Sequence, residues 1–273
     1  MKTTDRGAET RPYEPARATG VRRITAGAIK RRKGKQIFPM VTAYDAAFAR
    51  IVEDAGIDYI LVGDSLGNVV LGYDETTPVT VEEMIHHAKA VVRATVRAHV
   101  VVDMPFGSYH ISDEDALRNA IRIVKETGCS SVKVEGGVHE ADRVRAIARS
   151  GIPVVGHIGV TPQTASLGPG YKRRNNRERL IADAQAIEAA GAYAIVLEVV
   201  DDEISREITQ MLSIPTIGIG SGAQCDSQVL VLYDLLGMYP HAPSFVKRYG
   251  ELGQAAFDAL RTYAEDVRER KFP

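Results

Sequence analysis

Side chains that could bind a metal or move a proton follow two short apolar stretches of the sequence. Asp64 and Ser65 come directly after Tyr59–Gly63. Asp103 likewise follows His99–Val102. Apolar runs without alternation are typical of strands buried on both faces of a parallel sheet, and such sheets carry their chemistry at the carboxyl ends of the strands. The alternative is that Asp64 and Ser65 are turn residues that cap the next helix.

Lys133 and Glu135 repeat this arrangement further along the chain. Because side chains alternate along a strand, both would point to one face, with Val132 and Val134 on the other. In a barrel covered by helices, the valines would pack outward and the charges would point inward near the mouth. In an antiparallel sheet, an exposed strand would explain the same pattern.

Asp64, Asp103 and Glu135 supply hard oxygen ligands. Such ligands suit Mg²⁺, which prefers octahedral oxygen coordination and keeps several waters. We therefore expect these three carboxylates to form a metal site. The alternative is a set of structural salt bridges with Lys133 and nearby arginines.

Glu198 and His157 also end apolar runs. Glu198 follows Tyr193–Leu197, and apolar neighbours raise the pKa of a carboxylate, which suits a general base near neutral pH. His157 follows Val154–Gly156. It would either orient the substrate or be a core histidine satisfied by the backbone.

Helices and strands alternate along the chain, which predicts an α/β fold. Strands are expected at 37–42, 58–63, 99–103, 131–135, 153–157, 193–198, 215–219 and 228–232. Eight strands that alternate with helices predict a (β/α)₈ TIM barrel, and a doubly wound open sheet is the alternative. In a barrel the strand ends meet on one face. That face would gather Asp64, Ser65, Asp103, Lys133, Glu135, His157 and Glu198.

Capping residues mark several of the intervening helices. Asp45 begins a helix that Gly56 ends, Thr80 and Glu83 form a capping box, and Ser112 caps a helix over 113–127. Further helices are expected at 24–32, 140–149, 177–190, 202–212 and 244–270, the last broken at Tyr249–Gly250. Residues 66–78 are expected to form a long loop.

The chain length suits a single barrel domain preceded by a tail. The sequence has 273 residues, and a (β/α)₈ barrel typically takes about 250. Residues 2–20 contain no Val, Leu or Ile, so this segment has little apolar surface to bury. We expect residues 1–21 to be a flexible tail and residues 22–273 to be one domain that begins with a short helix.

Charge and cysteine content exclude several classes of protein. Lys+Arg number 34 and Asp+Glu number 35, so no basic footprint of a nucleic-acid binder is present. No apolar run approaches the ~18 residues of a membrane span. The amino terminus lacks the apolar core of a signal peptide. Cys129 and Cys225 form no CxxC motif, which is typical of free thiols in a reducing compartment. We expect a cytoplasmic protein.

The segment Gly218–Gly222 contains three glycines in five residues. It lacks the GxGxxG spacing of a dinucleotide-binding loop. Phosphate sites in barrels do form after the seventh and eighth strands, so the segment is a weak indication of close backbone approach to a ligand.

Six motifs in this order resemble the ketopantoate hydroxymethyltransferase (3-methyl-2-oxobutanoate hydroxymethyltransferase) family over residues 22–270. They are Thr42–Asp45, Leu61–Asp74, Asp103–Ser108, Val132–Gly136, Gly156–Gln163 and Pro215–Gly222. The chain departs from the family pattern at Ala165–Asn176, where the family usually has a Gly-Gly-Tyr turn and a shorter, less basic stretch. The tail also lies outside the pattern.

The resemblance implies a (β/α)₈ barrel, a homodecamer, that binds Mg²⁺ and uses 5,10-methylenetetrahydrofolate as co-substrate. The implied reaction transfers a hydroxymethyl group to 3-methyl-2-oxobutanoate (2-oxoisovalerate). It proceeds through a Mg²⁺-stabilised enolate and gives 2-dehydropantoate (ketopantoate) for pantothenate and coenzyme A synthesis.

The resemblance also implies a role for each site residue. Asp64 and Asp103 would bind the metal and contact the 2-oxo acid. Glu135 would belong to the metal shell through water. Ser65 and Lys133 would hold the substrate, and Glu198 would accept the proton.

Two other functions fit the same fold. Lyases of the phosphoenolpyruvate mutase and isocitrate lyase group are also Mg²⁺ barrels, but they usually carry a catalytic cysteine on a mobile loop. Cys129 lies just before a predicted strand, at the end opposite the chemistry, and Cys225 follows the glycine-rich segment. A non-catalytic ligand-binding barrel is the second alternative. The presence of all five of Asp64, Asp103, Lys133, Glu135 and Glu198 disfavours it.

Overall fold

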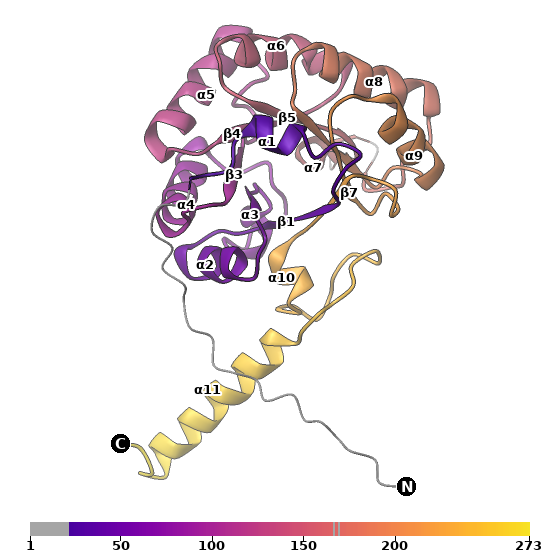
Figure 1. Cartoon of the computed structure of the whole chain (residues 1–273). Coiled ribbons are helices and arrows are strands. Elements are labelled where there is room, and N and C mark those ends of the chain that lie inside the picture. Colours follow the sequence, from indigo (N-terminus) through magenta and orange to yellow (C-terminus); the bar gives the residue numbers. More distant parts are fainter. Residues whose placement is uncertain (1–21, 166, 169) are drawn as a thin grey trace, which may run out of the picture.

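The computed structural model describes residues 22–165, 167–168 and 170–273, and its centre is a closed barrel of eight parallel strands (Figure 1). The expected TIM barrel is therefore confirmed. The tail expected at residues 1–21 lies outside the described residues. The strands are β1 (Phe38–Thr42), β2 (Tyr59–Val62), β3 (His99–Asp103), β4 (Ser131–Glu135), β5 (Val154–Gly159), β6 (Ala194–Glu198), β7 (Thr216–Ile219) and β8 (Ser227–Leu230).

The strand register places predicted site residues side by side. Asp103 at the end of β3 pairs with Lys133 on β4. Glu135 pairs with His157 on β5. Every residue of β2, β3 and β4 is buried, because side chains point either into the barrel or under the surrounding helices.

Helices cover the outside of the barrel, as the alternation predicts. They are α2 (Ala46–Asp54), α4 (Val81–Ala94), α5 (Asp113–Thr127), α6 (Ala141–Arg149), α8 (Arg177–Ala189) and α9 (Asp202–Met211), with the 3₁₀ turn η1 (Val138–Glu140) before α6. The predicted caps are present. Asp45 accepts from two backbone amides, Thr80 and Glu83 form the capping box, and Ser112 caps α5.

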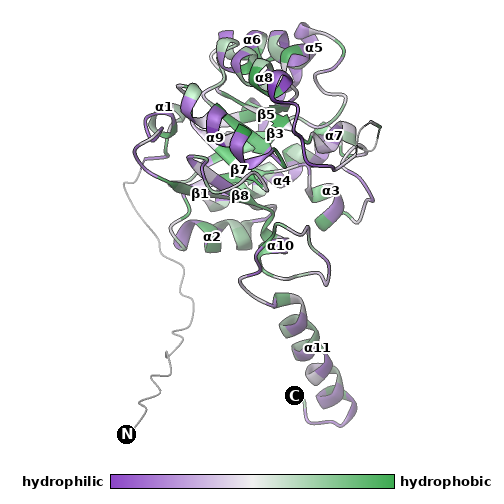
Figure 2. Cartoon of the chain, turned by 90° about the vertical axis from the view of Figure 1, so that its right-hand side faces the viewer, coloured by the Kyte–Doolittle hydropathy of each residue, from purple (hydrophilic) through white to green (hydrophobic). Residues whose placement is uncertain are grey.

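Figure 2 shows the hydrophobic strands at the centre of the ring of helices. One apolar cluster packs between strands and helices, and a second fills the barrel interior. The short helix α1 (Ala26–Lys30) contributes buried Ile29 to the interior cluster. The expected helix over 24–32 is present but shorter.

A buried polar cluster lies at the amino ends of the strands, away from the predicted site. The hydroxyls of Tyr193 and Ser131 lie 2.8 and 2.9 Å from Nε2 of His99. The Tyr59 hydroxyl lies 2.8 Å from that of Tyr193. Nδ1 of His99 lies 2.9 Å from the carbonyl oxygen of Ile24. Burial lowers the pKa of His99 to about 4, so the ring is neutral, with Nδ1–H donating to the carbonyl and Nε2 accepting.

Three expectations about local structure were wrong. Residues 66–78 are not a continuous loop, because α3 (Leu66–Val69) begins the segment. The short helix α7 (Pro162–Ala165) was not predicted, and α10 (Leu232–Leu235) begins where the last strand was expected to continue.

The largest error concerns the helix expected from residue 244. Residues 244–248 are not helical, the expected break at Tyr249–Gly250 is present, and the helix α11 covers only Leu252–Arg268. The amide of Tyr249 bonds to the carbonyl of Leu235, and that of Val246 bonds to Pro243. These tertiary and turn hydrogen bonds replace the i→i−4 ladder that a helix needs.

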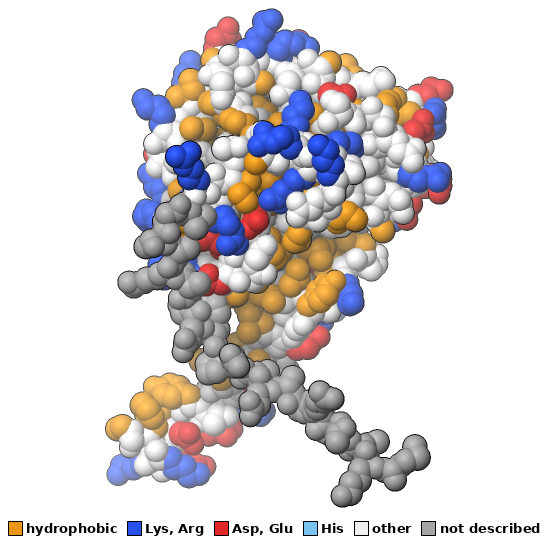
Figure 3. Space-filling model, viewed as in Figure 1, with side chains coloured by type: hydrophobic (Ala, Val, Ile, Leu, Met, Phe, Trp, Pro, Cys, Tyr) orange, Lys and Arg blue, Asp and Glu red, His pale blue; other side chains and the backbone are white. Residues whose placement is uncertain are grey.

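Helix α11 extends away from the barrel (Figure 1), and none of its residues is buried. Figure 3 shows hydrophobic side chains on its surface. Over the described ranges, we find no helix with the length and hydrophobicity required to cross a membrane.

Candidate active site

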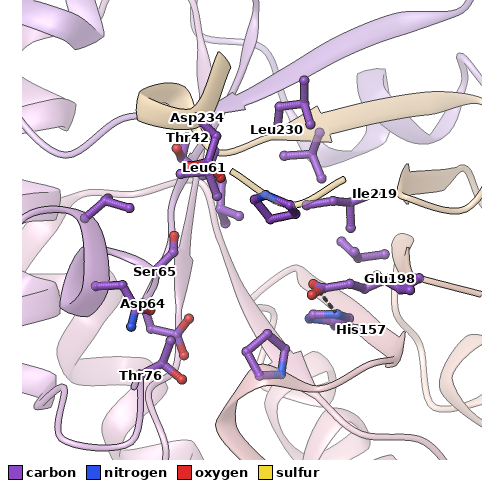
Figure 4. Close-up of a pocket in the computed structure, with 18 of the residues that line it drawn as sticks. Thr42, Leu61, Asp64, Ser65, Thr76, His157, Glu198, Ile219, Leu230 and Asp234 are labelled. Carbon is purple, nitrogen blue, oxygen red and sulfur yellow. Dashed lines mark ion pairs between the residues drawn. The ribbon is translucent and has the colours of Figure 1, made fainter. Parts of the chain in front are cut away.

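A pocket of about 570 Å³ opens at the carboxyl ends of the strands. Asp64 and Ser65 lie on one side of it, and His157 and Glu198 lie on the other (Figure 4). The structure brings all seven predicted residues into this one lining, namely Asp64, Ser65, Asp103, Lys133, Glu135, His157 and Glu198.

Asp64 and Asp103 lie next to each other at the same rim of the barrel. The backbone amide of Asp64 donates to Oδ2 of Asp103 across 3.1 Å. Both residues are buried. Burial, together with the nearby Glu135 and Asp103 charges, raises the pKa of Asp64 well above its ordinary value. Burial also raises the pKa of Asp103, although Lys133 opposes it. The pair therefore favours a compensating cation.

Lys133 lies among the acidic groups. Its Nζ is 3.3 Å from Oδ1 of Asp103, 3.2 Å from Oε1 of Glu135 and 3.0 Å from Nδ1 of His157. Burial would lower the pKa of Lys133, but the surrounding carboxylates outweigh it and raise that pKa. Burial would raise the pKa of Glu135, yet Lys133 and His157 lower it to about 2. Glu135 is therefore ionised.

His157 links Glu135 to Glu198. Its Nδ1 lies 3.2 Å from Oε1 of Glu135, and its Nε2 lies 3.3 Å from Oε2 of Glu198 (Figure 4). The Nε2 contact falls within ion-pair distance but lacks hydrogen-bond alignment. Burial and Lys133 lower the pKa of His157, but Glu135 and Glu198 raise it to about 9. Both ring nitrogens thus face charged side chains of the pocket, which is not the environment of a core histidine satisfied by the backbone.

Ser65 does not act as a helix cap. It precedes α3, but its side chain makes no capping hydrogen bond. Its Oγ instead lies 2.9 Å from the hydroxyl of the buried Tyr44. The interpretation of Ser65 as a capping turn residue is therefore not supported.

Sequence reasoning missed Gln163, which lies in α7 and is buried. Its Nε2 donates to Oδ2 of Asp64 across 2.7 Å and to the carbonyl of Met104 across 2.9 Å. Its backbone amide donates to Oε2 of Glu135 across 3.2 Å. The hydroxyl of Tyr109 donates to its Oε1 across 2.6 Å. The only signal in the sequence is that Gln163 ends one of the six motifs.

The glycine-rich segment approaches side chains of this protein. A Cβ on Gly220 would lie 2.8 Å from the ring of Phe245, and Gly220 has φ +62°. A Cβ on Gly222 would lie 2.9 Å from Asp202. Phe245 and Asp202 of this chain make these close approaches, and the expected approach of the segment to a ligand stays a prediction.

The acidic residues partly fit the expected metal. Among the described residues, no three Asp, Glu, His or Cys side chains are already arranged as a metal-binding group. Glu135 is fully engaged, because Lys133 and His157 contact Oε1 and Gln163 bonds to Oε2. Oδ1 of Asp103, however, is buried without a hydrogen-bond partner. This oxygen beside Asp64 has an ion pair with Lys133 at 3.3 Å but no hydrogen bond, which fits a hard cation held by these two aspartates.

The salt-bridge alternative is also present in part, because Lys133 forms ion pairs with Asp103 and Glu135. A closed (β/α)₈ barrel that gathers carboxylates, a lysine and a histidine around one pocket at its carboxyl face is typical of a TIM-barrel enzyme.

Sequence comparison then identifies the particular family. The model of the ketopantoate hydroxymethyltransferase family matches residues 23–273. The chain belongs to this family, which confirms the resemblance and the expectation of a transferase.

Curated relatives agree with the family assignment. The chain is 54% identical over 248 residues to a 3-methyl-2-oxobutanoate hydroxymethyltransferase of Heliobacterium modesticaldum, covering 89% of this chain and 90% of the relative. It is 50% identical over 257 residues to the enzyme of the same name from Syntrophomonas wolfei, covering 92% and 93%.

Solved structures share the fold at low sequence identity. A phosphoenolpyruvate phosphomutase from Streptomyces platensis subsp. rosaceus superposes with a TM-score of 0.61 at 16% identity, covering 90% of this chain and 88% of that one. A 2,3-dimethylmalate lyase superposes with a TM-score of 0.60 at 16% identity, covering 92% and 90%. These similarities support the barrel alone.

Proposed function

We propose that this enzyme transfers a hydroxymethyl group from 5,10-methylenetetrahydrofolate to 3-methyl-2-oxobutanoate, giving 2-dehydropantoate. Family membership and the names of the curated relatives support the ketopantoate-forming reaction. The observation that carries the proposal is the arrangement of one pocket, where Asp64 faces Glu198 across the cavity and Asp103 belongs to the same lining.

Asp64 and Asp103 are the residues that would hold Mg²⁺. Glu135, engaged by protein partners on both oxygens, would act on the ion through water. When bound, the ion supplies Lewis-acid stabilisation of the negative charge that develops on the oxygens of a 2-oxo acid.

Lys133 and Ser65 would hold the 2-oxo acid. Lys133 is a buried residue of the pocket lining. Its positive charge can stabilise the negative charge that develops on the oxygens of the substrate. Ser65 offers a hydroxyl positioned by Tyr44. Both donors are held before substrate arrives, so little reorganisation is needed during the reaction.

Glu198 is the candidate for the general base. It ends β6, borders the pocket, and has its Oε2 beside His157. Its carboxylate would take the C3 proton of the 2-oxo acid. C3 would then bond to the methylene carbon of the folate as one C–N bond of the methylene bridge breaks. Hydrolysis of the other C–N bond would supply the hydroxyl group and release tetrahydrofolate. A positioned base contributes about 10²–10⁴-fold to the proton transfer. His157 would orient the Glu198 carboxylate through the contact between its Nε2 and Oε2 of Glu198.

The cysteine positions argue against the lyase alternative. Cys129 precedes β4 and Cys225 precedes β8, so both lie near the amino ends of strands. Both are buried, and among the described residues that line the pocket neither appears. The thiol chemistry of that group therefore has no candidate residue at the site.

Product analysis tests the proposed function. The enzyme is incubated with Mg²⁺ and 3-methyl-2-oxobutanoate, with and without 5,10-methylenetetrahydrofolate, and the products are followed by NMR. The proposal expects 2-dehydropantoate only when the folate is present. Cleavage of the 2-oxo acid without folate would favour a lyase, and no turnover would favour a non-catalytic barrel.

We also propose that the chain forms a homo-oligomer, and a decamer is the assembly that the family resemblance implies. The support lies in α11, where Phe257, Leu260, Tyr263 and Val267 share one face and are 58%, 67%, 55% and 44% exposed. An isolated apolar helix face of this kind is typical of a surface that packs against another chain.

A further inference from the structure

A second cavity of about 450 Å³ lies beside the active-site pocket. Glu135 belongs to the linings of both cavities. The connection between β5 and α8 also runs from one to the other. Tyr171 lines the active-site pocket, and the residues that follow, Arg173–Asn176, line the second cavity. A ligand bound in the first cavity could therefore extend into the second.

Three arginines line the cavity together with Glu135, Glu140 and Asp183, and of these arginines Arg174 alone lacks a carboxylate partner among the described residues. Arg174 forms no ion pair with the described residues, and its side chain donates to the carbonyls of Lys172 and Gly170. Arg179 reaches only Asp183, at 3.8 Å, and is 73% exposed. Burial and the neighbouring charge of Arg179 lower the pKa of Arg174, which shows that the two cations repel each other.

Other arginines of the same stretch are neutralised, which makes Arg174 and Arg179 distinctive. Arg173 is paired with Asp202, and Arg177 is paired through two nitrogens with Glu207. Arg174 has no counter-charge among the described residues and Arg179 has only the 3.8 Å pair with Asp183, so an anionic ligand would stabilise both cations. Arginine suits a carboxylate in particular, because its planar donors match the two oxygens.

We infer that this cavity binds the glutamate tail of the folate co-substrate, with Arg174 and Arg179 contacting its carboxylates. The inference rests on the proposed function, which places the reacting end of the folate in the adjacent pocket. A folate carries carboxylates only at its glutamyl end, and each γ-linked glutamate adds another. The basic stretch in which this chain departs from its family pattern would thus favour polyglutamylated folate.

Direct binding tests the inference without relying on turnover. Tetrahydrofolate with one glutamate and tetrahydrofolate with five γ-linked glutamates are titrated into the full-length enzyme by isothermal calorimetry. We expect the pentaglutamate to bind about tenfold more tightly, the size of one charge-assisted hydrogen bond. The preference should weaken with added salt, because the contacts are partly exposed.

Single-residue variants test which arginines produce the preference for the pentaglutamate. Arg174→Ala and Arg179→Glu are each expected to remove most of it. Arg179→Glu keeps the test independent of loop packing, since Arg174 also bonds to the carbonyls of its own loop. Arg177→Ala is the matched control, because Arg177 lies on the same stretch, is paired with Glu207 and does not line the cavity. It should keep the wild-type preference.

Equal affinity of the wild type for the two folates would overturn the inference, as would an equal loss of preference in Arg177→Ala. Exchange of the substrate C3 proton in D₂O needs no folate and reports on the proposed function separately. If the wild type catalyses that exchange but binds both folates equally, only the tail site is wrong. If exchange and folate binding are both absent, the proposed function itself fails.

Discussion

The side-chain amide of Gln163 donates to Oδ2 of Asp64 across 2.7 Å, and Tyr109 donates to the carbonyl oxygen of that amide across 2.6 Å. The tyrosine hydroxyl thereby fixes which end of the amide faces Asp64. A donor in this place stabilises the ionised carboxylate, which is the form that binds a cation. Gln163 is therefore a positioning residue for Asp64.

Replacement of Gln163 tests this relationship. Gln163→Leu removes the amide donor from Oδ2 of Asp64 and from the Met104 carbonyl, which is expected to cost about 1–3 kcal/mol of unfolding free energy for each buried group left unpaired, while the Tyr109 hydroxyl keeps the Glu135 carbonyl. It should also weaken Mg²⁺ binding about tenfold. Urea denaturation and calorimetric titration with Mg²⁺ measure the two effects. Tyr109→Phe keeps the amide and should lose less of both. Unchanged Mg²⁺ affinity in Gln163→Leu would contradict the positioning role.

The charge of the buried Asp64 is expected to lower the stability of the metal-free protein while it serves Mg²⁺ binding. Because the pKa of Asp64 is raised in the fold, the stability of the metal-free protein falls as pH rises above the unfolded value of 3.8. Asp64→Asn removes that charge and should stabilise the metal-free protein at pH 8 by on the order of 1 kcal/mol. Mg²⁺ should raise the melting temperature of the wild type but not of the variant.

The control for this trade-off is Asp142→Asn, which changes an exposed carboxylate on α6. It should leave both the stability and the Mg²⁺ response unaltered. An Asp64→Asn protein that is less stable than the wild type at pH 8, yet still stabilised by Mg²⁺, would exclude Asp64 as a ligand.

The buried, neutral His99 is expected to make the stability of the protein fall in acid, independently of the active site. Its pKa is about 4 in the fold and 6.5 in the unfolded chain, so the unfolded chain binds more protons between these values. Stability is therefore lost as pH falls from 6.5 to about 4, by about 3 kcal/mol at 1.36 kcal/mol per pH unit.

Chemical denaturation across this pH range measures the effect of His99. His99→Gln cannot titrate and should show a shallower loss of unfolding free energy, even if it is less stable at pH 7. Parallel pH profiles for the two proteins would show that the histidine does not control the acid sensitivity.

The exposed apolar face of α11 is expected to hold the subunits of the homo-oligomer together. Leu260→Glu places a charge in the centre of the apolar face and should shift the protein to smaller species in sedimentation velocity. Thr262→Glu adds the same charge on the opposite face of the helix and should leave the assembly intact. A wild-type protein that sediments as a monomer would refute the proposed homo-oligomer.

The sequence predicts the barrel well, because several buried strands, such as β2 and β6, are apolar runs that are followed by or end at a polar residue. Asp64 and Asp103 follow such runs, Glu135 ends a strand that alternates valine with polar residues, and closure of the barrel brings the three together whatever their separation in the chain. Hydrophobic periodicity and helix caps sufficed to predict these strands and helices, since both signals depend on residues that are close in the sequence.

The errors arise where tertiary contacts decide. Residues 244–248 are predicted to be helical, but tertiary and turn hydrogen bonds decide the conformation around them, such as that from the Tyr249 amide to the Leu235 carbonyl. Gln163 lies where no helix is predicted, and its role depends on contacts with Asp64 and Met104, which follow β2 and β3. The pairing of Arg177 and the isolation of Arg174 likewise depend on where α9 packs.

The central claim is that Glu198 removes the C3 proton of a 2-oxo acid held opposite it by Asp64, Asp103 and Lys133. Proton NMR in D₂O, with Mg²⁺ and 3-methyl-2-oxobutanoate but no folate, follows loss of the C3 signal. We expect exchange by the wild type, with a rate reduced about 10²–10⁴-fold in Glu198→Gln. Undiminished exchange in Glu198→Gln would contradict the account.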